Sequence, residues 1–288
     1  MKIKKIGLVA RGNDATAHQI AATFAGQCVA EGITPLLSAD SIATIAPEKS
    51  ALSLMPGLSV MPIKDISQTA DVCLVLGGDG TFLGAASGLY QAKNCPLLGI
   101  NLGHLGFLTD VPQEAIHHLI ADLRQDKFKA QARHYYLATL CDKDEQCWQQ
   151  HFLNDAVIQR NADEKMIRFE VDSGQWRVAS ARADGLIVST PTGSTAYNLS
   201  TGGPILHPNI DALIISPICP HNLAFRPVVV PPKDIYIRLM TDGHLSIDGR
   251  QSHVMKQGDY VKIKQSPHVL KTLVHQDYNF FDVLREKF

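Results

Sequence analysis

The chain has 288 residues, which is long enough for two domains that each bury a core. It is 45% hydrophobic and 19% charged, a composition typical of globular proteins, and its net charge is −1. This charge gives no electrostatic reason to bind nucleic acid or an anionic membrane surface. The first apolar run ends at Arg11, too soon for a signal peptide, and no apolar segment approaches the ~18 residues of a transmembrane helix. We therefore expect a cytoplasmic protein.

The cysteines and histidines give no sign of a metal centre. No C-x-x-C pair and no H-E-x-x-H motif occurs, and the histidines are scattered along the chain. We expect the cysteines to be reduced thiols rather than disulfide partners or zinc ligands; they are Cys28, Cys73, Cys95, Cys141, Cys147 and Cys219.

The first third of the chain alternates between short apolar runs and segments with helical periodicity. Strands are predicted at residues 3–10, 33–37, 72–76 and 97–101, and helices at 15–31 and 81–91. Residues 38–61 are weakly periodic and contain Pro47 and Pro56, so we predict mostly helix and loop there. This alternation predicts an α/β domain over residues 1–108, with a doubly wound, Rossmann-like parallel sheet.

The pattern changes after a further predicted helix at 113–123. Short strand-like runs separated by polar turns predict a β-rich, sandwich-like domain over residues 109–270. These runs are 135–140, 151–158, 166–171, 176–179, 185–189, 212–215, 228–230, 235–239, 245–247 and 260–264. We expect the aromatic tail, residues 271–288, to pack back on the first domain.

A glycine-rich segment follows the predicted strand at 72–76. Gly77, Gly78 and Gly80 surround Asp79, and Thr81 opens the next helix. Open α/β sheets place ligands at the carboxyl ends of their strands, and glycines let backbone N–H groups approach phosphate oxygens. In such a site Asp79 would hold a metal or accept a proton. The alternative is a tight turn, because Asp-Gly is a common hairpin dipeptide.

A second dense segment runs from Asp184 to Ser200. A strand leads into a proline-set turn, and then hydroxyl-bearing residues and Gly193 open a helix near Tyr197. Such a helix start suits polar ligand oxygens, and a tyrosine offers a flat face to a base. An ordinary capped helix start, with Thr192 or Ser194 as the cap, is the alternative. Asn154 and Asp155 interrupt an apolar run, so they either cap a bulge or reach a ligand.

These motifs occur in the order found in bacterial NAD kinases, which the chain resembles over nearly its whole length. The motifs are Gly77–Thr81, Gly99–Phe107, Leu153–Asp155, Asp184–Ser200 and Gly202–Pro204. The glycine motif is shared with diacylglycerol- and sphingosine-type lipid kinases, whereas the segment from Asp184 to Ser200 is more specific. The resemblance implies an α/β domain, a β-rich domain and a homotetramer.

The resemblance also assigns roles to residues. Asp79 matches the proposed proton acceptor, and Gly77, Gly78, Gly80 and Thr81 would hold the phosphate donor. The NAD contacts would be Asp79, Gly80, Phe107, Asn154, Asp155, Lys165, Arg182, Asp184, Thr195, Ala196, Tyr197, Asn198, Ser200, Arg250 and Gln251. Two positions depart from the family pattern: Asp155 stands where many relatives have Glu, and relatives often have a single Gln near Arg250 and Gln251.

We therefore predict an enzyme that transfers the terminal phosphoryl group of ATP to the 2′-hydroxyl of the adenosine ribose of NAD. Mg²⁺ is expected to arrive with ATP, and no protein-bound metal is expected. The alternatives are a lipid kinase of the diacylglycerol type, which leaves the segment from Asp184 to Ser200 without a role, and a dinucleotide-binding sensor without catalysis.

Overall fold

The computed structural model describes residues 3–43, 50–52, 58–90, 95–103, 105–161 and 165–288. Pro47, Pro56 and His104, which belong to predicted segments, lie outside the described residues. The chain forms two compact units. Unit 1 contains Met1–Ala132 and Leu270–Phe288, and unit 2 contains Arg133–Val269. In the described part of the chain, no helix has the length and apolarity needed to cross a membrane.

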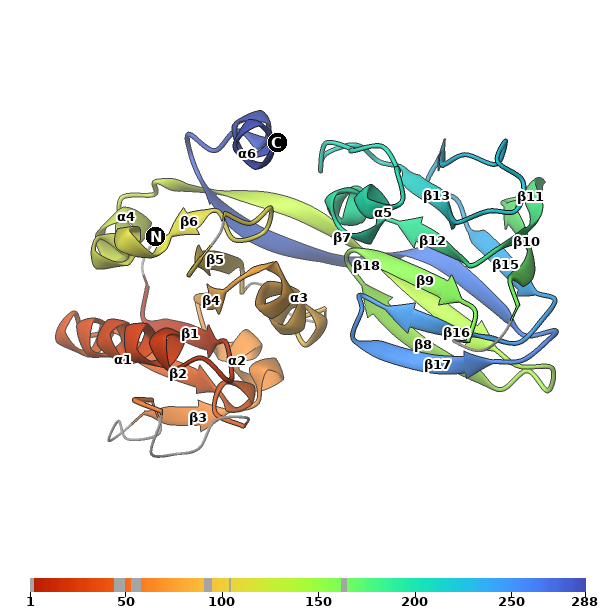
Figure 1. Ribbon diagram of the computed structural model, residues 1–288. Coiled ribbons are helices and arrows are strands. Elements are labelled where there is room, and N and C mark those ends of the chain that lie inside the picture. Colours follow the sequence, from red (N-terminus) through yellow and green to blue (C-terminus); the bar gives the residue numbers. More distant parts are fainter. Residues whose placement is uncertain (1–2, 44–49, 53–57, 91–94, 104, 162–164) are drawn as a thin grey trace. The chain divides into compact units, whose positions relative to one another are not determined.

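Unit 1 is built from strands that alternate with helices (Figure 1). In chain order its elements are β1 (Lys5–Ala10), α1 (Ala15–Ala30), β2 (Thr34–Ser38), η1 (Ala39–Ser41), β3 (Ser59–Met61), α2 (Ile63–Thr69), β4 (Val72–Gly77), α3 (Asp79–Ser87), β5 (Leu97–Asn101), β6 (Val111–Pro112), η3 (Gln113–His117), α4 (Leu119–Arg124) and, from the end of the chain, α6 (Phe280–Lys287). The first helix begins where the Asp14 side chain accepts hydrogen bonds from the backbone N–H groups of Thr16 and Ala17, as expected of an N-cap.

The strands of unit 1 pair in parallel in the order β3–β2–β1–β4–β5. The strands β2 and β3 therefore lie on one side of β1, and the later strands β4 and β5 lie on its other side. Helices lie on both faces of the sheet. Phe24 of α1 packs with the face of β1 that carries Ile6, whereas Ile66 of α2 lies against Gly7 on the opposite face. The predicted doubly wound parallel sheet is confirmed.

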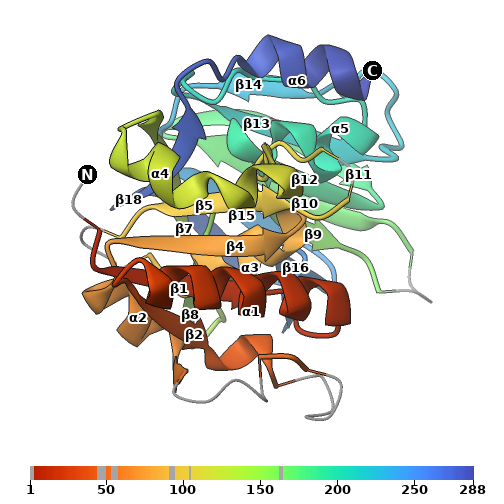
Figure 2. The same ribbon diagram turned by 90° about the vertical axis from the view of Figure 1, so that its left-hand side faces the viewer.

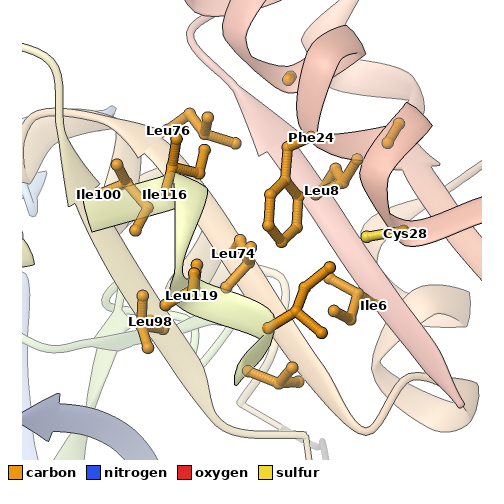
Figure 3. Packing of buried hydrophobic residues seen from close by; sticks show 14 of the residues in the cluster. Ile6, Leu8, Phe24, Cys28, Leu74, Leu76, Leu98, Ile100, Ile116 and Leu119 are labelled. Carbon is orange, nitrogen blue, oxygen red and sulfur yellow. The ribbon is translucent and has the colours of Figure 1, made fainter. Parts of the chain in front are cut away.

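The core of unit 1 lies under α1 and α4 (Figures 2 and 3). Alternate residues of adjacent strands point to the same face of a sheet. Ile6 and Leu8 of β1, Leu74 and Leu76 of β4, and Leu98 and Ile100 of β5 thus form one continuous apolar layer. Phe24 and Cys28 of α1 cover one part of it, and Ile116 of η3 with Leu119 of α4 cover another.

Residues 109–132 belong to unit 1, whereas the boundary expected from the sequence lay after residue 108. The reason is packing, because Ile116, Leu119 and Leu123 of this segment are buried in the core of unit 1. The end of the chain also belongs to unit 1, and Phe280 of α6 contacts the ring of Phe107 at a centroid distance of 6.1 Å.

Unit 2 is a β-sandwich, as predicted. Its strands are β7 (Phe128–Cys141), β8 (Cys147–Phe152), β9 (Asp155–Gln159), β10 (Ile167–Ser173), β11 (Trp176–Ala183), β12 (Gly185–Ser189), β13 (Leu213–Ile218), β14 (Val228–Val230), β15 (Ile235–Leu239), β16 (Gly243–Ile247), β17 (Gln251–Met255) and β18 (Tyr260–His275). One antiparallel sheet has the order β14–β13–β12–β9–β16–β17. Its inner face packs on β10, β15 and the neighbouring parts of β7 and β18. The strands β7 and β18 each continue into unit 1.

Several details of the chain differ from the sequence-based prediction. The predicted strand at 151–158 is two strands, β8 and β9, because residues 153 and 154 leave the sheet between them. The strands β3 and β17 were not predicted, since both have exposed residues and little apolar character. The predicted helix after Thr192 is a 3₁₀ turn, η4 (Thr192–Thr195), followed by a single α turn, α5 (Tyr197–Ser200).

The expectation that all cysteines are reduced is wrong for Cys141 and Cys147, which form a disulfide. The two residues lie directly opposite each other in the β7–β8 hairpin, and their Cα atoms are 4.2 Å apart. From the sequence, this pairing could be inferred only if the register of the β7–β8 hairpin were known. Cys28, Cys73, Cys95 and Cys219 are free thiols.

Alkylation under non-reducing conditions should separate these classes of cysteine. Cys219 is exposed and should react in the folded protein, whereas burial raises the thiol pKa of Cys28 and Cys95 to about 12 and leaves them unreactive. We expect mass spectrometry to find one label on the folded protein, four on the unfolded protein and six after reduction. Labelling of Cys147 in unfolded protein that has not been reduced would contradict the disulfide.

Candidate functional site

The order of the strands in unit 1 reverses between β1 and β4. Such a switch point opens a crevice at the carboxyl ends of the strands, where doubly wound proteins bind ligands. Here the backbone N–H of Arg11, just after β1, donates to the carbonyl oxygen of Leu76 in β4 at 3.0 Å. The glycine segment Gly77–Gly80 follows β4 directly, so the fold places the predicted phosphate-binding segment at the switch point.

Gly77 and Thr81 fit closely together within this segment. A Cβ atom at Gly77 would lie 2.5 Å from the Thr81 hydroxyl oxygen, so only glycine leaves room for this helix start. Gly78 and Gly80 would meet nothing within 4 Å, and the space beside them is open to a ligand. The helix α3 begins at Asp79, which excludes the hairpin-turn alternative for this segment.

The Asp79 carboxylate is bound to the loop that follows β5. Its Oδ2 accepts a hydrogen bond from the backbone N–H of Phe107 at 2.9 Å. Its Oδ1 accepts from the backbone N–H groups of Leu108 and Thr109, at 3.0 and 3.2 Å, and from the Thr109 hydroxyl at 3.2 Å. Asp79 thus accepts four hydrogen bonds, three at Oδ1 and one at Oδ2, so Oδ2 keeps one of its two acceptor positions. The close approach also requires Gly106, because a Cβ there would lie 2.2 Å from Asp79 Oδ1.

Phe107 therefore has two roles in unit 1. Its backbone binds Asp79, and its ring contacts Phe280 and the Lys287 ammonium group, which is 5.0 Å from the ring centroid. Both residues belong to α6, so the C-terminal helix covers part of the ring that we expected to contact NAD.

In unit 2, a turn formed by Leu153, Asn154 and Asp155 lies between β8 and β9. The carboxylate of Asp248 accepts hydrogen bonds from all three backbone N–H groups, at 3.0, 2.8 and 3.1 Å. The backbone N–H of Asp248 in turn donates to the carbonyl oxygen of Asp155 at 3.0 Å. The turn and Asp248 thus form one hydrogen-bonded structure.

Asn154 and Asp155 are buried in this turn, with exposed fractions of 8% and 5%. Among the described residues, Asn154 Oδ1 has no hydrogen-bond partner, which is costly for a buried acceptor. Burial, together with the negative charge of Asp248, raises the pKa of Asp155 to about 7. The turn thus presents an unsatisfied amide oxygen and a carboxyl group that titrates near neutral pH.

The segment after β12 packs against the same turn. The backbone N–H of Thr190 donates to the carbonyl oxygen of Asn154 at 2.9 Å, and a Cβ at Gly193 would collide with that oxygen. Ser194 is fully buried and donates to the carbonyl oxygen of Pro191, so it has no access to act as a nucleophile. Asn198 is also fully buried, and both ends of its amide are bound within the protein. Asn198, one of the residues predicted to contact NAD, therefore stabilises this segment through the hydrogen bonds of its amide.

Tyr197 and Asp184 lie at the other end of the β9–β12 strand pair. Gln159 at the end of β9 donates to the Tyr197 hydroxyl at 3.0 Å, and the Arg160 guanidinium binds Asp184 Oδ1 at 3.0 Å. Asp155 and Gln159 are four residues apart on β9, so about 13 Å separates the two ends. The predicted residues of unit 2 therefore follow one strand pair, with Asn154 and Asp155 at one end and Tyr197 and Asp184 at the other.

The remaining predicted residues are exposed or half-buried. Lys165, Arg250, Gln251 and Ser200 lie on the surface, and Thr195 and Ala196 are half-buried. Arg182 lies directly opposite Arg168 across β10 and β11, and both line a pocket of about 480 Å³ together with His221. Two opposed arginines repel each other unless an anion lies between them.

Sequence reasoning missed three residues that the structure connects with these sites. Arg11 follows β1 at the switch point, Arg160 binds Asp184, and Asp248 holds the turn at Asn154. The position of Arg11 at the end of the first strand was a usable signal, since that end faces the ligand crevice. The contacts of Arg160 and Asp248 join distant parts of the sequence and leave no local pattern.

The described residues contain one group of His, Cys, Asp or Glu atoms close enough to share a metal ion, formed by Cys141, Glu145 and Cys147. Because the two sulfurs are joined in a disulfide, they are not available as thiolate ligands in this state.

A doubly wound sheet with a glycine turn at its switch point defines a nucleotide-binding α/β protein, here joined to a β-sandwich unit. Residues 6–128 match the ATP-NAD kinase N-terminal domain, and residues 153–275 match the ATP-NAD kinase C-terminal domain. The chain belongs to the ATP-NAD kinase family, and it is a kinase, that is, a phosphotransferase.

Bacterial relatives agree with this assignment. An NAD kinase from Magnetococcus marinus is 38% identical over 251 residues, which cover 85% of this chain and 82% of that protein. An NAD kinase from Geobacter sulfurreducens is 34% identical over 289 residues, covering 99% of this chain and 98% of that protein.

Two solved structures share the fold. Yeast NADH kinase, solved in complex with NADH, has a TM-score of 0.87 at 22% identity, covering 99% of this chain and 87% of that one. An NAD kinase from Archaeoglobus fulgidus, solved in complex with ATP, has a TM-score of 0.72 at 22% identity, covering 98% of this chain and 99% of that one.

The raised pKa of Asp155 predicts how its replacement changes stability with pH. The folded protein holds this proton up to about pH 7, whereas an unfolded aspartate releases it near pH 4, so the contribution to stability is lost between these values. We expect Asp155→Asn to become more stable relative to the wild type as pH rises through this range, by roughly 2–4 kcal/mol. Chemical denaturation at several pH values measures the difference. Asp144→Asn, at an exposed hairpin position, is the control, and a pH-independent difference for Asp155→Asn would contradict the shift.

Proposed function

We propose that the protein transfers the terminal phosphoryl group of ATP to the 2′-hydroxyl of the adenosine ribose of NAD, producing NADP. The observation that carries this proposal is the glycine turn at the switch point of unit 1, with a carboxylate at its centre. Membership of the ATP-NAD kinase family supports NAD as the acceptor. The partners would be these two small molecules, without nucleic acid or a membrane surface, in the cytoplasm.

Unit 1 would bind the phosphate donor. The backbone of Gly77, Gly78, Gly80 and Thr81 can surround phosphate oxygens at the start of α3, where the helix dipole favours negative charge. Gly77 pairs with Asn101, which lines a pocket of about 500 Å³ together with Asp110 and Glu114. These carboxylates suit a phosphate group that carries Mg²⁺ better than a bare phosphate. Mg²⁺ would compensate the donor's charge, and it would be held mainly by ATP because Asp79 already accepts four hydrogen bonds from the protein.

Unit 2 would bind NAD along the β9–β12 strand pair. Asn154 Oδ1 is an acceptor without a partner among the described residues, so it suits an N–H or O–H donor on the adenosine. The ionised Asp155 carboxylate can accept from ribose hydroxyls, and Tyr197, 38% exposed, offers its ring to a base. Asp184, about a third exposed beside Arg160, would orient further hydroxyl groups. Arg182, Lys165, Thr195, Ala196, Ser200, Arg250 and Gln251 would supply the remaining contacts.

Asp79 would accept the proton of the attacking hydroxyl. Its Oδ2 accepts a single hydrogen bond, from Phe107, so this oxygen keeps an acceptor position for the substrate hydroxyl. The main contribution of the protein to such a reaction is positioning and charge compensation, with general base catalysis adding to it.

Self-association is a further part of the proposal. The edge strand β14 exposes Val228 and Val229, and an exposed apolar edge of a sheet is prone to pair with another chain. Together with the family resemblance, this edge supports a homo-oligomer, which we propose is a tetramer.

The deciding experiment is incubation of the purified protein with NAD, ATP and Mg²⁺, followed by chromatographic measurement of NADP. We expect NADP to form with the wild type, to stop when EDTA removes Mg²⁺, and to fall by about 10²–10⁴-fold in Asp79→Asn. Thr109→Val is the matched control, because it removes one donor to the carboxylate but keeps its charge, and its kcat should stay within a few-fold. No NADP from the folded wild type would overturn the function, and near-normal turnover by Asp79→Asn would overturn the role of Asp79.

The NAD assignment of unit 2 predicts a loss of affinity without loss of fold. Tyr197→Ala removes the exposed ring, so calorimetric titration should show weaker NAD binding by roughly tenfold, as expected for one base-stacking aromatic residue. Tyr236→Ala is the control, since Tyr236 is a similarly exposed tyrosine of unit 2 on β15. Equal NAD affinity in the two variants would remove Tyr197 from the site.

A further inference from the structure

Asp248 lies outside the family motifs named above, yet its carboxylate binds one of them, Leu153–Asp155. We propose that Asp248 is a positioning residue for NAD binding: it holds the turn Leu153–Asp155 in the shape that presents Asn154 and Asp155 to the ligand, and its charge sets the pH range in which the turn binds. This inference rests on the proposed function, since it concerns the NAD contacts of unit 2.

The hydrogen bonds of Asp248 fix the whole turn. Its Oδ2 accepts from Leu153, and its Oδ1 accepts from Asn154 and Asp155, so three consecutive N–H groups converge on one carboxylate. Leu153 and Asn154 leave the sheet between β8 and β9, so their N–H groups would otherwise need partners elsewhere, and Asp155 is the first residue of β9. The turn therefore depends on a residue 93 or more positions later in the chain.

The backbone at Asp248 is specialised for this task. Its φ is +49°, in the left-handed region that Asp and Asn adopt more readily than other residues with side chains. Gly249 follows with a φ of +63°. These two residues turn the chain from β16 into β17 and point the carboxylate back towards the turn, as its three accepted bonds show.

The orientation of Asn154 follows from this arrangement. Its N–H is bound to Asp248 and its carbonyl oxygen to the N–H of Thr190, so both backbone groups are fixed. The side-chain oxygen is buried and has no partner among the described residues. A buried acceptor that is held in place but left unsatisfied is poised to receive a donor from a ligand.

The charge of Asp248 acts on Asp155 as well. Burial raises the pKa of both carboxyl groups, and the negative charge of Asp248 adds to the shift of Asp155, whose pKa is about 7. Three backbone hydrogen bonds and the Arg250 guanidinium act in the opposite direction on Asp248 and favour its ionised form. Asp248 thereby delays the ionisation of Asp155, which accepts ribose hydroxyls best when ionised.

The other charged and titratable groups that face this turn do not change charge in the same range. From β7, Tyr135 is buried, and its pKa is raised by burial and by Asp248, so its phenol stays neutral. Arg133 of β7 donates to the Thr192 hydroxyl at 3.3 Å, and both it and Arg250 stay positively charged. From β12 and η4, the facing residues are Ser189, Thr190, Thr192 and Gly193, which carry no charge.

The test uses the full-length chain with the Asp248→Asn substitution. Asn tolerates the left-handed backbone and keeps one acceptor oxygen, but it removes the charge and at least one of the three hydrogen bonds. Asp142→Asn is the matched control, because Asp142 also accepts two backbone N–H bonds in unit 2, within the β7–β8 hairpin. The measurements are KM for NAD, KM for ATP and kcat, with calorimetric NAD affinity followed from about pH 5.5 to pH 8.5.

We expect Asp248→Asn to raise KM for NAD by about ten- to a hundredfold, as for loss of a charge-assisted hydrogen bond, while KM for ATP stays within twofold. NAD affinity of the wild type should rise with pH through about pH 7, as Asp155 ionises. In Asp248→Asn this midpoint should move to lower pH, because the neighbouring charge is gone. A merely structural role would weaken binding equally at every pH.

The outcomes separate this inference from the proposed function. If the wild type makes NADP but Asp248→Asn has an unchanged KM for NAD, or an unchanged midpoint, the inference is wrong and the function stands. If the wild type makes no NADP, the function itself fails. If Asp248→Asn does not fold, Asp248→Glu decides: it keeps the charge but displaces the oxygens by one methylene, so KM for NAD should rise with the midpoint unchanged. An unchanged KM in that variant would overturn the inference.

Discussion

Both units depend on the same interaction, in which one aspartate carboxylate accepts the N–H groups of three consecutive residues in a distant loop. In unit 1, Asp79 binds Phe107, Leu108 and Thr109, and in unit 2, Asp248 binds Leu153, Asn154 and Asp155. All of these residues except Asp155, the first residue of β9, lie outside the sheets, where no ladder partner satisfies their N–H groups. Charge-assisted hydrogen bonds are stronger than neutral ones, and one carboxylate can therefore fix a whole loop. These two carboxylates thus hold residues that the proposed function uses, namely Phe107 in unit 1 and Asn154 and Asp155 in unit 2.

The fold of unit 1 is predictable because its signals are local. Each buried parallel strand is a short apolar run. The strand β4 follows this rule, and the glycines directly after it mark the turn into α3. The strand β3 escaped prediction because it lies at the edge of the sheet, with Ser59 and Val60 exposed and no apolar run to mark it.

The candidate sites were only partly predictable, because sequence motifs mark residues but do not say what their side chains contact. Asn198 belongs to a dense motif, yet its amide is used within the protein, where it binds Ser194, Pro204 and Ser216. The reverse holds for Arg160, which has no motif around it but neutralises Asp184. The disulfide between Cys141 and Cys147 was missed for a similar reason, since it depends on the register of β7 and β8 rather than on spacing.

The path of the chain also has a consequence for biosynthesis. Unit 2 is one continuous stretch, Arg133–Val269, whereas unit 1 needs Leu270–Phe288 to supply the strand segment beside β5 and the helix α6. During synthesis the N-terminal part of the chain leaves the ribosome first, and a domain made of one continuous stretch can fold as it emerges. Unit 2 is therefore complete before unit 1, and Phe107, whose backbone binds Asp79, gains its contacts with Phe280 and Lys287 only after the whole of unit 2 has been made.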